Sequence, residues 1–361
     1  MKRLDRYIIG KFLVAFFYTA LLFTMIAIVI DFAEKSEKIL NSDARWTEII
    51  FTYYLNYIPY INGLLWPLFS LIAVIFFTSR LASDSEFIAL LNAGVSFERL
   101  MLPYLMGAFF IAGIYFLGGH YIIPKANKLK FEFEYDVIRD GGDRGQTRDV
   151  HFMLDQDTKV FVRYYRKTDT SARDVRIEHF QEGQIRKITA IDRMNWAGPP
   201  NLWELNNFTE HLYGKEKEAI YKFPDSSRVM ALNLYPADFV EYKHDRDQMT
   251  SPELLAFIAD QRSRGRSGLK VYEVEFHRRT AESVTIIILT LIGMAVASRK
   301  ERGGAGIHLA VGIGLGATFV FLSRFSTAFA TNQDTSPLIG VWLPNILFLG
   351  IAIYLISRAQ R

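Results

Sequence analysis

Residues 12–30 read FLVAFFYTALLFTMIAIVI, and this uncharged run is long enough to cross a bilayer as a helix. Basic residues precede the run, as in a secretory signal peptide, but it is longer than the apolar core of such a peptide. The segment that follows, DFAEKSEK at 31–38, contains no small-residue cleavage signal. The sequence therefore predicts a retained first transmembrane helix at about 11–30.

Five further apolar stretches of about 20 residues follow, so we expect six transmembrane helices. The second is separated from an apolar segment at 47–58, which we expect to be an interfacial helix, by Pro59 and the pair Asn62-Gly63. The six expected spans are about 11–30, 61–80, 99–122, 279–298, 306–329 and 337–357.

Lys and Arg residues near the span ends indicate the orientation. They gather at the N-terminus, between spans four and five, and at the C-terminus, whereas the loop TNQDTSP at 331–337 has none. Both termini are therefore expected in the cytoplasm. This places the loop 79–98 in the cytoplasm and the block 123–278 on the opposite side. The clustered basic residues are Lys2, Arg3, Arg6, Lys11, Arg299, Lys300, Arg302, Arg358 and Arg361.

The spacing of β-rich runs and turns in the block between spans three and four predicts a β domain. Its β-rich runs are separated by turn signals at about ten-residue spacing, which is typical of an antiparallel meander or a jelly roll. A T-x-x-E capping box at Thr250–Glu253 then begins a short helix. The predicted fold is an α-helical membrane protein with six transmembrane helices and an inserted periplasmic all-β, jelly-roll-like domain. Its predicted parts are 1–122 with spans one to three, 123–248 with the β domain, 249–278 with the connecting helix and re-entry segment, and 279–361 with spans four to six.

Several kinds of chemistry are not supported by the sequence. Without cysteine the chain has no disulfides, thiolate nucleophiles or cysteine metal sites. There is no basic stripe for nucleic acid, no phosphate-binding G-x-x-x-x-G-K-[ST] and no G-x-S-x-G. The seven histidines are scattered, and we expect them to be ordinary interfacial or surface residues. Gly312, Gly314 and Gly316 match part of a dinucleotide motif, but inside the fifth span they indicate close helix packing. A transport or scaffold protein is therefore expected rather than an enzyme.

Each charged residue at or near the membrane can be interpreted either as structural or as part of a binding site. Arg324, deep in the fifth span, either faces a polar cavity or extends toward the interface. Glu282 follows Arg278 by four residues and Arg279 by three, so these side chains either form helix-end ion pairs or leave the arginines free for an anionic ligand. Lys35 and Lys38, just beyond the first span, raise the same question.

The loop SRLASDSEFIALLNAGVSFE at 79–98 predicts a short helix over about 83–93. Ser83 is expected to cap it, with Glu86 completing a capping box, and Gly94 is expected to end it. Phe87, Leu90 and Leu91 are spaced to form one apolar face.

Three segments together resemble the lipopolysaccharide-export permease family, LptF/LptG. LDRYIIGKFL at 4–13 is similar to the family's opening, and SEFIALLNAGVS at 85–96 is similar to its cytoplasmic loop, the most specific of the three. IIPKANKLKFEFE at 122–134 resembles the exit from its third span, and the order of three spans, a β domain and three spans is also the family's. The LDRYI opening and the pattern of spans four to six are more similar to LptG than to LptF.

The resemblance implies a permease subunit of an ABC transporter in the bacterial inner membrane. Such a subunit extracts lipopolysaccharide from the outer leaflet and passes it to a periplasmic bridge. The implied partners are the paralogous permease (LptF, or LptG if this chain is LptF), two LptB ATPase subunits that hold ATP and Mg²⁺, LptC, an LptA-type bridge and lipopolysaccharide. No cofactor is implied in this chain itself, and no nucleic acid. The alternatives are a membrane-anchored periplasmic scaffold or sensor, and a lipoprotein-type ABC permease.

The resemblance also implies two sets of site residues. The cytoplasmic helix would couple to the ATPase, and cations near the lipid headgroups would attract phosphates. The coupling candidates are Glu86, Phe87, Leu90, Leu91 and Gly94. The lipopolysaccharide-binding candidates are Lys35, Lys38, Arg278, Arg279 and Arg324.

Overall fold

A computed structural model describes residues 3–359 except for short stretches within that range. The chain divides into two compact units, a membrane unit of Met1–Arg139, Arg246–Leu254 and Lys270–Arg361, and a β unit of Asp140–Asp245 and Leu255–Leu269. The stretches not described are 43, 139–147, 155–156, 167–168, 182, 200, 215–217, 233, 237–244, 264–268, 299–304 and 333–334. Expectations for Arg299, Lys300 and Arg302, and for the end of the connecting helix near Gly265 or Gly268, fall outside the described residues.

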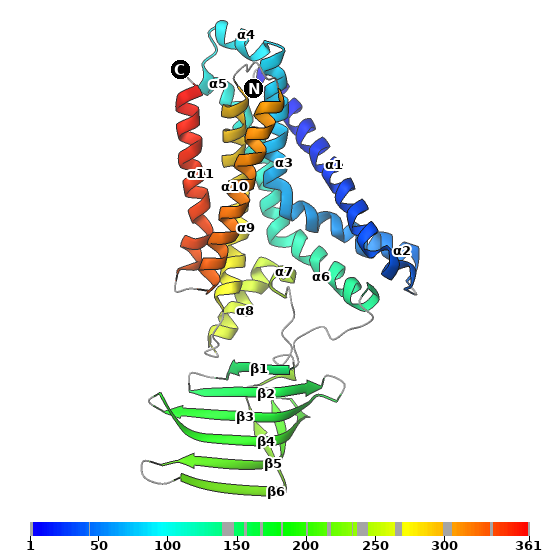
Figure 1. The fold of residues 1–361 in the computed structure, drawn as a ribbon, viewed down its shortest axis with the longest axis vertical. Coiled ribbons are helices and arrows are strands. Elements are labelled where there is room, and N and C mark those ends of the chain that lie inside the picture. The colour runs from blue at the N-terminus through cyan, green and yellow to red at the C-terminus, as the bar shows by residue number, and fades with distance from the viewer. Residues whose placement is uncertain are drawn as a thin grey trace. The chain divides into compact units, whose positions relative to one another are not determined.

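Among its described residues, the membrane unit contains six helical segments that are long and apolar enough to cross a bilayer, as predicted. The N- and C-terminal ends of the described chain lie at the same end of this unit as α4 (Figure 1). Its elements are α1 (Arg3–Leu40), α2 (Trp46–Glu48), η1 (Ile49–Tyr54), α3 (Leu55–Ser83), α4 (Glu86–Asn92), α5 (Phe97–Leu117), η2 (Gly118–Ile122), α6 (Ile123–Phe133), η3 (Glu134–Ile138), α9 (Lys270–Ala297), α10 (Ala305–Asn332) and α11 (Pro337–Ala359). The short helices α7 (Asp245–Gln248) and α8 (Ser251–Ser263) precede α9.

The expected break between the interfacial helix at 47–58 and the second span is absent from the described residues. Helical structure continues from Trp46 to Ser83 and bends instead, so that α2 and the start of α3 run at a steep angle to the rest of α3 (Figure 1). The side chain of Asn62 stabilises the region after Pro59 by donating to Ile58 O at 2.8 Å and to Thr24 Oγ1 at 3.0 Å.

The predicted boundary of the β domain at residue 123 is wrong. Residues 123–138 form α6 and η3, which belong to the membrane unit. Lys130, near the end of α6, is buried against the rings of Tyr60 and Phe131, with its Nζ 4.0 and 4.2 Å from their centroids. These contacts keep a polar segment helical, although its sequence lacks the apolar character of a span.

The helices pack around α9, which contacts α3, α5, α10 and α11. Ser70 on α3 and Thr290 on α9 join their hydroxyls at 2.8 Å in a fully buried contact. A Cβ at Gly312 would overlap Ile75, and one at Gly316 would lie 2.9 Å from Leu68, so these glycines bring α10 against α3. The expected role in close helix packing is confirmed for these two glycines and is wrong for Gly314, whose added Cβ would have no atom within 4 Å.

The β unit is a six-stranded antiparallel sheet whose strands follow one another in chain order (Figure 1). Alternating side chains such as Val160, Val162 and Ile177 form its core, and Trp203 is fully buried, donating from Nε1 to Leu234 O at 2.8 Å. The inserted antiparallel domain is therefore confirmed. The strands are β1 (Arg148–Met153), β2 (Thr158–Arg166), β3 (Ser171–Gln181), β4 (Gln184–Gly198), β5 (Leu202–Tyr213) and β6 (Glu218–Ala231).

Candidate functional site

The short helix between the second and third spans is α4, and it is shorter than predicted. Ser83 is the last residue of α3, so it cannot cap α4, and Glu86 is the first residue of α4 rather than the third. The predicted capping box is therefore wrong, because α3 continues further than its apolar run. Gly94 ends the helix as expected, since its φ of +84° is readily adopted by glycine.

The apolar face of α4 is only partly available to a partner. Phe87 is 1% exposed and packs against Phe97 with ring centroids 6.2 Å apart, inside the core formed by α1, α3 and α5. Leu90 is half-buried against the same core, whereas Glu86 and Leu91 are exposed. The Phe87 side chain already fills this chain's own core, so it is not presented to another protein in this conformation.

The start of α1 holds the region around α4 through two polar contacts. The Tyr7 hydroxyl donates to Glu86 Oε2 at 3.2 Å. Asp5 Oδ1 lies 2.7 Å from Arg99 Nη2 near the start of α5, and the Asp5 side chain is nearly buried. Asp5 and Tyr7 belong to the LDRYI segment, so the sequence pattern marked them, but periodicity could not show what they contact.

At the other end of α1, Lys35 lies within a charge-balanced cluster. Its Nζ is 2.7 Å from Asp31 Oδ1 and 3.6 Å from Glu134 Oε1, and it also donates to the Tyr53 hydroxyl. Lys130 Nζ pairs with Glu134 Oε2 at 3.1 Å, so two lysines face two carboxylates. Because these charges satisfy one another, Lys35 is not a free cation in this conformation.

Lys38 and Arg324 differ from Lys35 because their side chains are exposed. Neither has an ion-pair partner among the residues that the structure describes. Arg324 lies on α10 next to Phe325, whose ring is 54% exposed, in a segment apolar enough to face lipid. Both cations are therefore accessible to an anionic group from outside the chain.

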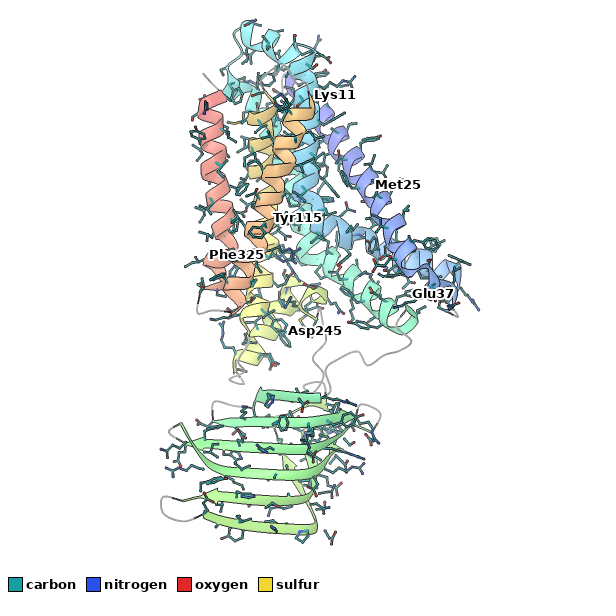
Figure 2. All side chains as sticks on the ribbon, in the orientation of Figure 1. Lys11, Met25, Glu37, Tyr115, Asp245 and Phe325 are labelled. Atoms are coloured by element: carbon teal, nitrogen blue, oxygen red, sulfur yellow. The ribbon has the colours of Figure 1, made fainter. Side chains whose placement is uncertain are left out.

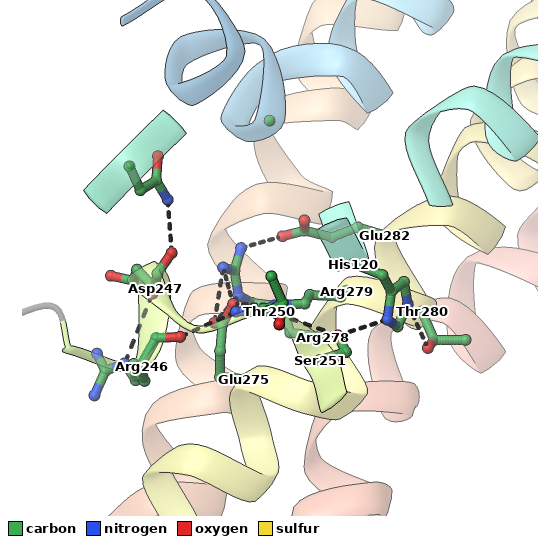
Figure 3. Close-up of polar contacts among 12 residues, drawn as sticks. His120, Arg246, Asp247, Thr250, Ser251, Glu275, Arg278, Arg279, Thr280 and Glu282 are labelled. Atoms are coloured by element: carbon green, nitrogen blue, oxygen red, sulfur yellow. Dashed lines mark hydrogen bonds and ion pairs between the residues drawn. The ribbon is translucent and has the colours of Figure 1, made fainter. Parts of the chain in front are cut away.

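Arg278 is part of an ion-pair network at the start of α9 (Figure 3). Its guanidinium lies 2.8 Å from Glu275 Oε2 and 2.7 Å from Glu282 Oε1. The helix-end pair with Glu282 that the spacing allowed is present, and Glu275 adds a second carboxylate. The Glu282 carboxylate also accepts a hydrogen bond from the buried Tyr115 hydroxyl on α5.

Arg279 is 4% exposed and has three acceptors (Figure 3). Its Nε donates to Glu275 Oε1 at 2.9 Å, its Nη1 to Ser251 Oγ at 3.2 Å, and its Nη2 to Arg246 O at 3.0 Å. The side chain therefore joins α9 to α7 and to the first residue of α8. Its hydrogen-bonding groups are directed at this chain rather than at a ligand.

His120 in η2 completes this polar network. Its Nδ1 lies 2.7 Å from Ser251 Oγ, and its ring lies 4.2 Å from that of Phe116. The expectation of an ordinary interfacial or surface histidine is wrong for His120, which is 6% exposed, and for His308 on α10, which is 5% exposed. A partner more than a hundred residues away gave no signal in the local sequence.

The β unit has no nominated site residue, but the connecting helix α8 has a defined start. Thr250 donates to Glu253 Oε2 from both its backbone N at 2.8 Å and its hydroxyl at 2.7 Å. The reach of Glu253 back to the backbone agrees with the expected capping box. The hydrogen bonds from Thr250, side chain first, hold the pKa of Glu253 below its usual value.

Comparisons with known proteins place this architecture among lipid exporters. Residues 6–358 match the family model described as the lipopolysaccharide export system permease LptF/LptG. The chain is also 22% identical over 360 residues to a protein of Haemophilus influenzae named lipopolysaccharide export system permease protein LptG, and the match covers 99% of each chain. The match takes in α1 from Arg6 onward, the α4 segment and the β unit alike.

Proposed function

The chain belongs to the lipopolysaccharide export system permease family LptF/LptG, and we propose that it is the LptG-type permease of a transporter that extracts lipopolysaccharide from the outer leaflet of the bacterial inner membrane. The family and the six spans make it a multi-pass inner-membrane transport subunit rather than an enzyme. The LptG assignment is supported by the relative that carries this name, although that relative is 22% identical.

The proposed transport is driven by ATP and Mg²⁺ held on two copies of a separate LptB ATPase. In this proposal the chain pairs with LptF, and lipopolysaccharide passes to LptC and an LptA-type periplasmic bridge. Both termini and α4 are proposed to lie in the cytoplasm and the β unit in the periplasm. Basic residues near the span ends support this orientation, as does the placement of α4 at the same end of the membrane unit as both chain ends (Figure 1).

We select among the coupling candidates and the lipopolysaccharide-binding candidates by the exposure of their side chains. Glu86 and Leu91 are proposed to contact the ATPase, with Leu90 and Gly94 shaping that surface. Lys38 and Arg324 are proposed to contact lipid phosphates, because an exposed cation near the headgroups attracts them and can add a charge-assisted hydrogen bond.

The match of residues 6–358 to one permease family carries this proposal. Purification of the chain from its native membrane in mild detergent should recover an ATPase whose ATP hydrolysis depends on this chain. Glu86→Lys should abolish that dependence without preventing membrane insertion. Asp84→Lys is the matched control, since Asp84 is also exposed and its Oδ2 lies 3.9 Å from Arg80 Nε. Normal ATPase activity and transport in Glu86→Lys would refute the proposed role of Glu86.

The lipid contact is tested by a photocrosslinker introduced at position 324. We expect it to capture lipopolysaccharide, whereas the same crosslinker at Ile353, which is 62% exposed on α11, should capture bulk phospholipid. Capture of phospholipid alone at both positions would contradict the proposed lipid contact of Arg324.

A further inference from the structure

The Glu86 carboxylate is held from within this chain by a residue of a different span. The Tyr7 hydroxyl on α1 donates to Glu86 Oε2 at 3.2 Å, across 79 positions of sequence. Both side chains are exposed, so the contact lies at the surface where a partner would reach Glu86. An ionised carboxylate offers about four acceptor positions, so the bond from Tyr7 leaves Glu86 able to accept from a second donor.

The backbone around this contact is fixed by buried packing. Next to Tyr7, Ile8 is 2% exposed and lies in the same core as Phe87, the residue after Glu86. The Asp5–Arg99 ion pair, at 2.7 Å, fixes the first turn of α1 to the start of α5. Tyr7 therefore projects from a helix that packs with α4 and α5, and its bond favours one orientation of the Glu86 carboxylate.

The helix that carries Tyr7 extends to the Lys35 cluster. α1 is one helix of 38 residues without a proline, and Lys11, Met25 and Glu37 follow one another along it (Figure 2). Tyr7 and Lys35 are separated by 28 positions, which is about 42 Å of helix at 1.5 Å per residue. The helix between Tyr7 and the Asp31–Lys35 pair is therefore continuous, which gives a direct path along α1 from one site to the other.

We propose that Tyr7 is a positioning residue of the coupling site. It orients Glu86 so that the carboxylate bridges α1 and a basic side chain of the ATPase partner, and it transmits the movement of Glu86 to α1. This inference rests on the proposed function, because it requires an ATPase that contacts Glu86. It adds the path along α1 by which a movement at Glu86 is transmitted to the opposite end of the first span.

Tyr7→Phe removes the hydroxyl and keeps the ring, so it tests this path in the intact transporter. In proteoliposomes containing lipopolysaccharide, we expect the purified complex to keep its ATPase subunits while lipid released per ATP falls about two- to tenfold, as for loss of one ordinary solvent-exposed hydrogen bond. Tyr18→Phe is the matched control: Tyr18 is 66% exposed on the same helix and makes no hydrogen bond within the described chain. An effect of Tyr7→Phe equal to that of Tyr18→Phe would overturn the inference.

A double-mutant cycle tests whether the loss of lipid release comes from the Tyr7–Glu86 hydrogen bond rather than from Tyr7 alone. If Tyr7 acts through Glu86, Tyr7→Phe should cause little further loss of lipid release per ATP in a Glu86→Gln background. Additive losses would overturn the inference while leaving the proposed function intact. A Glu86→Lys variant with normal ATPase stimulation would overturn both this inference and the proposed role of Glu86, whereas failure to recover any ATPase with the chain would overturn the proposed function.

Movement of α1 provides a readout that a purely structural role would not change. Because the chain contains no cysteine, spin labels can be attached at Met25→Cys on α1 and Phe321→Cys on α10, both exposed positions. We expect the distance between the labels to change when a non-hydrolysable ATP analogue is added, and this change to be reduced in Tyr7→Phe. An undiminished change in Tyr7→Phe would contradict the proposed transmission.

Discussion

Replacement of Arg279 by Met tests whether this cation is structural or a lipid ligand. Arg279 is 4% exposed and donates to Glu275, Ser251 and the Arg246 carbonyl at 2.9, 3.2 and 3.0 Å. Breaking a buried ion pair costs about 3–5 kcal/mol, because the remaining charge is left without its partner. Glu275 keeps Arg278 at 2.8 Å, so the lower end, about 3 kcal/mol, is expected here.

The assay is thermal unfolding of the purified complex in detergent. A loss of about 3 kcal/mol lowers the melting midpoint by roughly 6–12 °C if the membrane unit unfolds as one body of about 240 residues. The control is Arg324→Met, because an exposed side chain without a described ion-pair partner should change stability by at most about 0.5 kcal/mol. We also expect Arg324→Met to lose lipopolysaccharide binding and Arg279→Met to keep it when folded. The reasoning is refuted if Arg279→Met leaves the midpoint unchanged and loses lipopolysaccharide binding.

Three further predictions follow from packing and hydrogen bonding. Phe87→Ala should lower the free energy of unfolding by about 3–5 kcal/mol, and Phe87→Leu by less, as measured by melting midpoints of the two variants. Gly340→Ala should separate α10 from α11 and destabilise the membrane unit, since a Cβ there would lie 3.3 Å from backbone atoms of α10. Gly350→Ala, on the same helix with no atom within 4 Å of its Cβ, should be neutral or stabilising by up to about 1 kcal/mol in the same measurement. Hydrogen bonds from Thr250 lower the pKa of Glu253, so their stabilising effect is present above the usual pKa of a glutamate and is lost as the pH falls through the lowered value. Thr250→Val should therefore raise that pKa and shift the loss to higher pH, which a carboxyl ¹³C titration can check.

The spans could be predicted because the apolar runs are long, but their ends could not. Residues 31–40 and 123–138 are polar enough to read as loops, yet they extend helices by one or more turns. Lys35 and Lys130 explain this, because each is neutralised by a carboxylate from within or beyond its own helix. Lys35 also lies 3.6 Å from Glu134 of η3, and Lys130 lies over the ring of Tyr60 on α3; tertiary contacts of this kind override a local pattern.

The candidate site was predicted as a set of residues but not as a set of contacts. Helical spacing placed Phe87, Leu90 and Leu91 on one face, but spacing cannot show which part of a face this chain covers itself. It also allowed the pair of Arg278 with Glu282, since four residues separate them. The bond from Tyr7 to Glu86 lies beyond any local pattern, because the two residues come from different helices.

The ion pairs also determine how much free energy it costs a lipid phosphate to bind each cation. Phosphate binding at Lys38 or Arg324 requires only that the cation and the phosphate lose part of their hydration. A phosphate that contacts Lys35 must first displace Asp31 at 2.7 Å and Glu134 at 3.6 Å, and both carboxylates would then need new partners. Movement of α1 relative to η3 would separate Lys35 from Glu134 and leave Asp31, four residues away on the same helix, as its remaining carboxylate partner. The same helix begins at the contact with Glu86, so a nucleotide-driven movement of α1 would change the availability of Lys35 while leaving Arg324 on α10 unaffected.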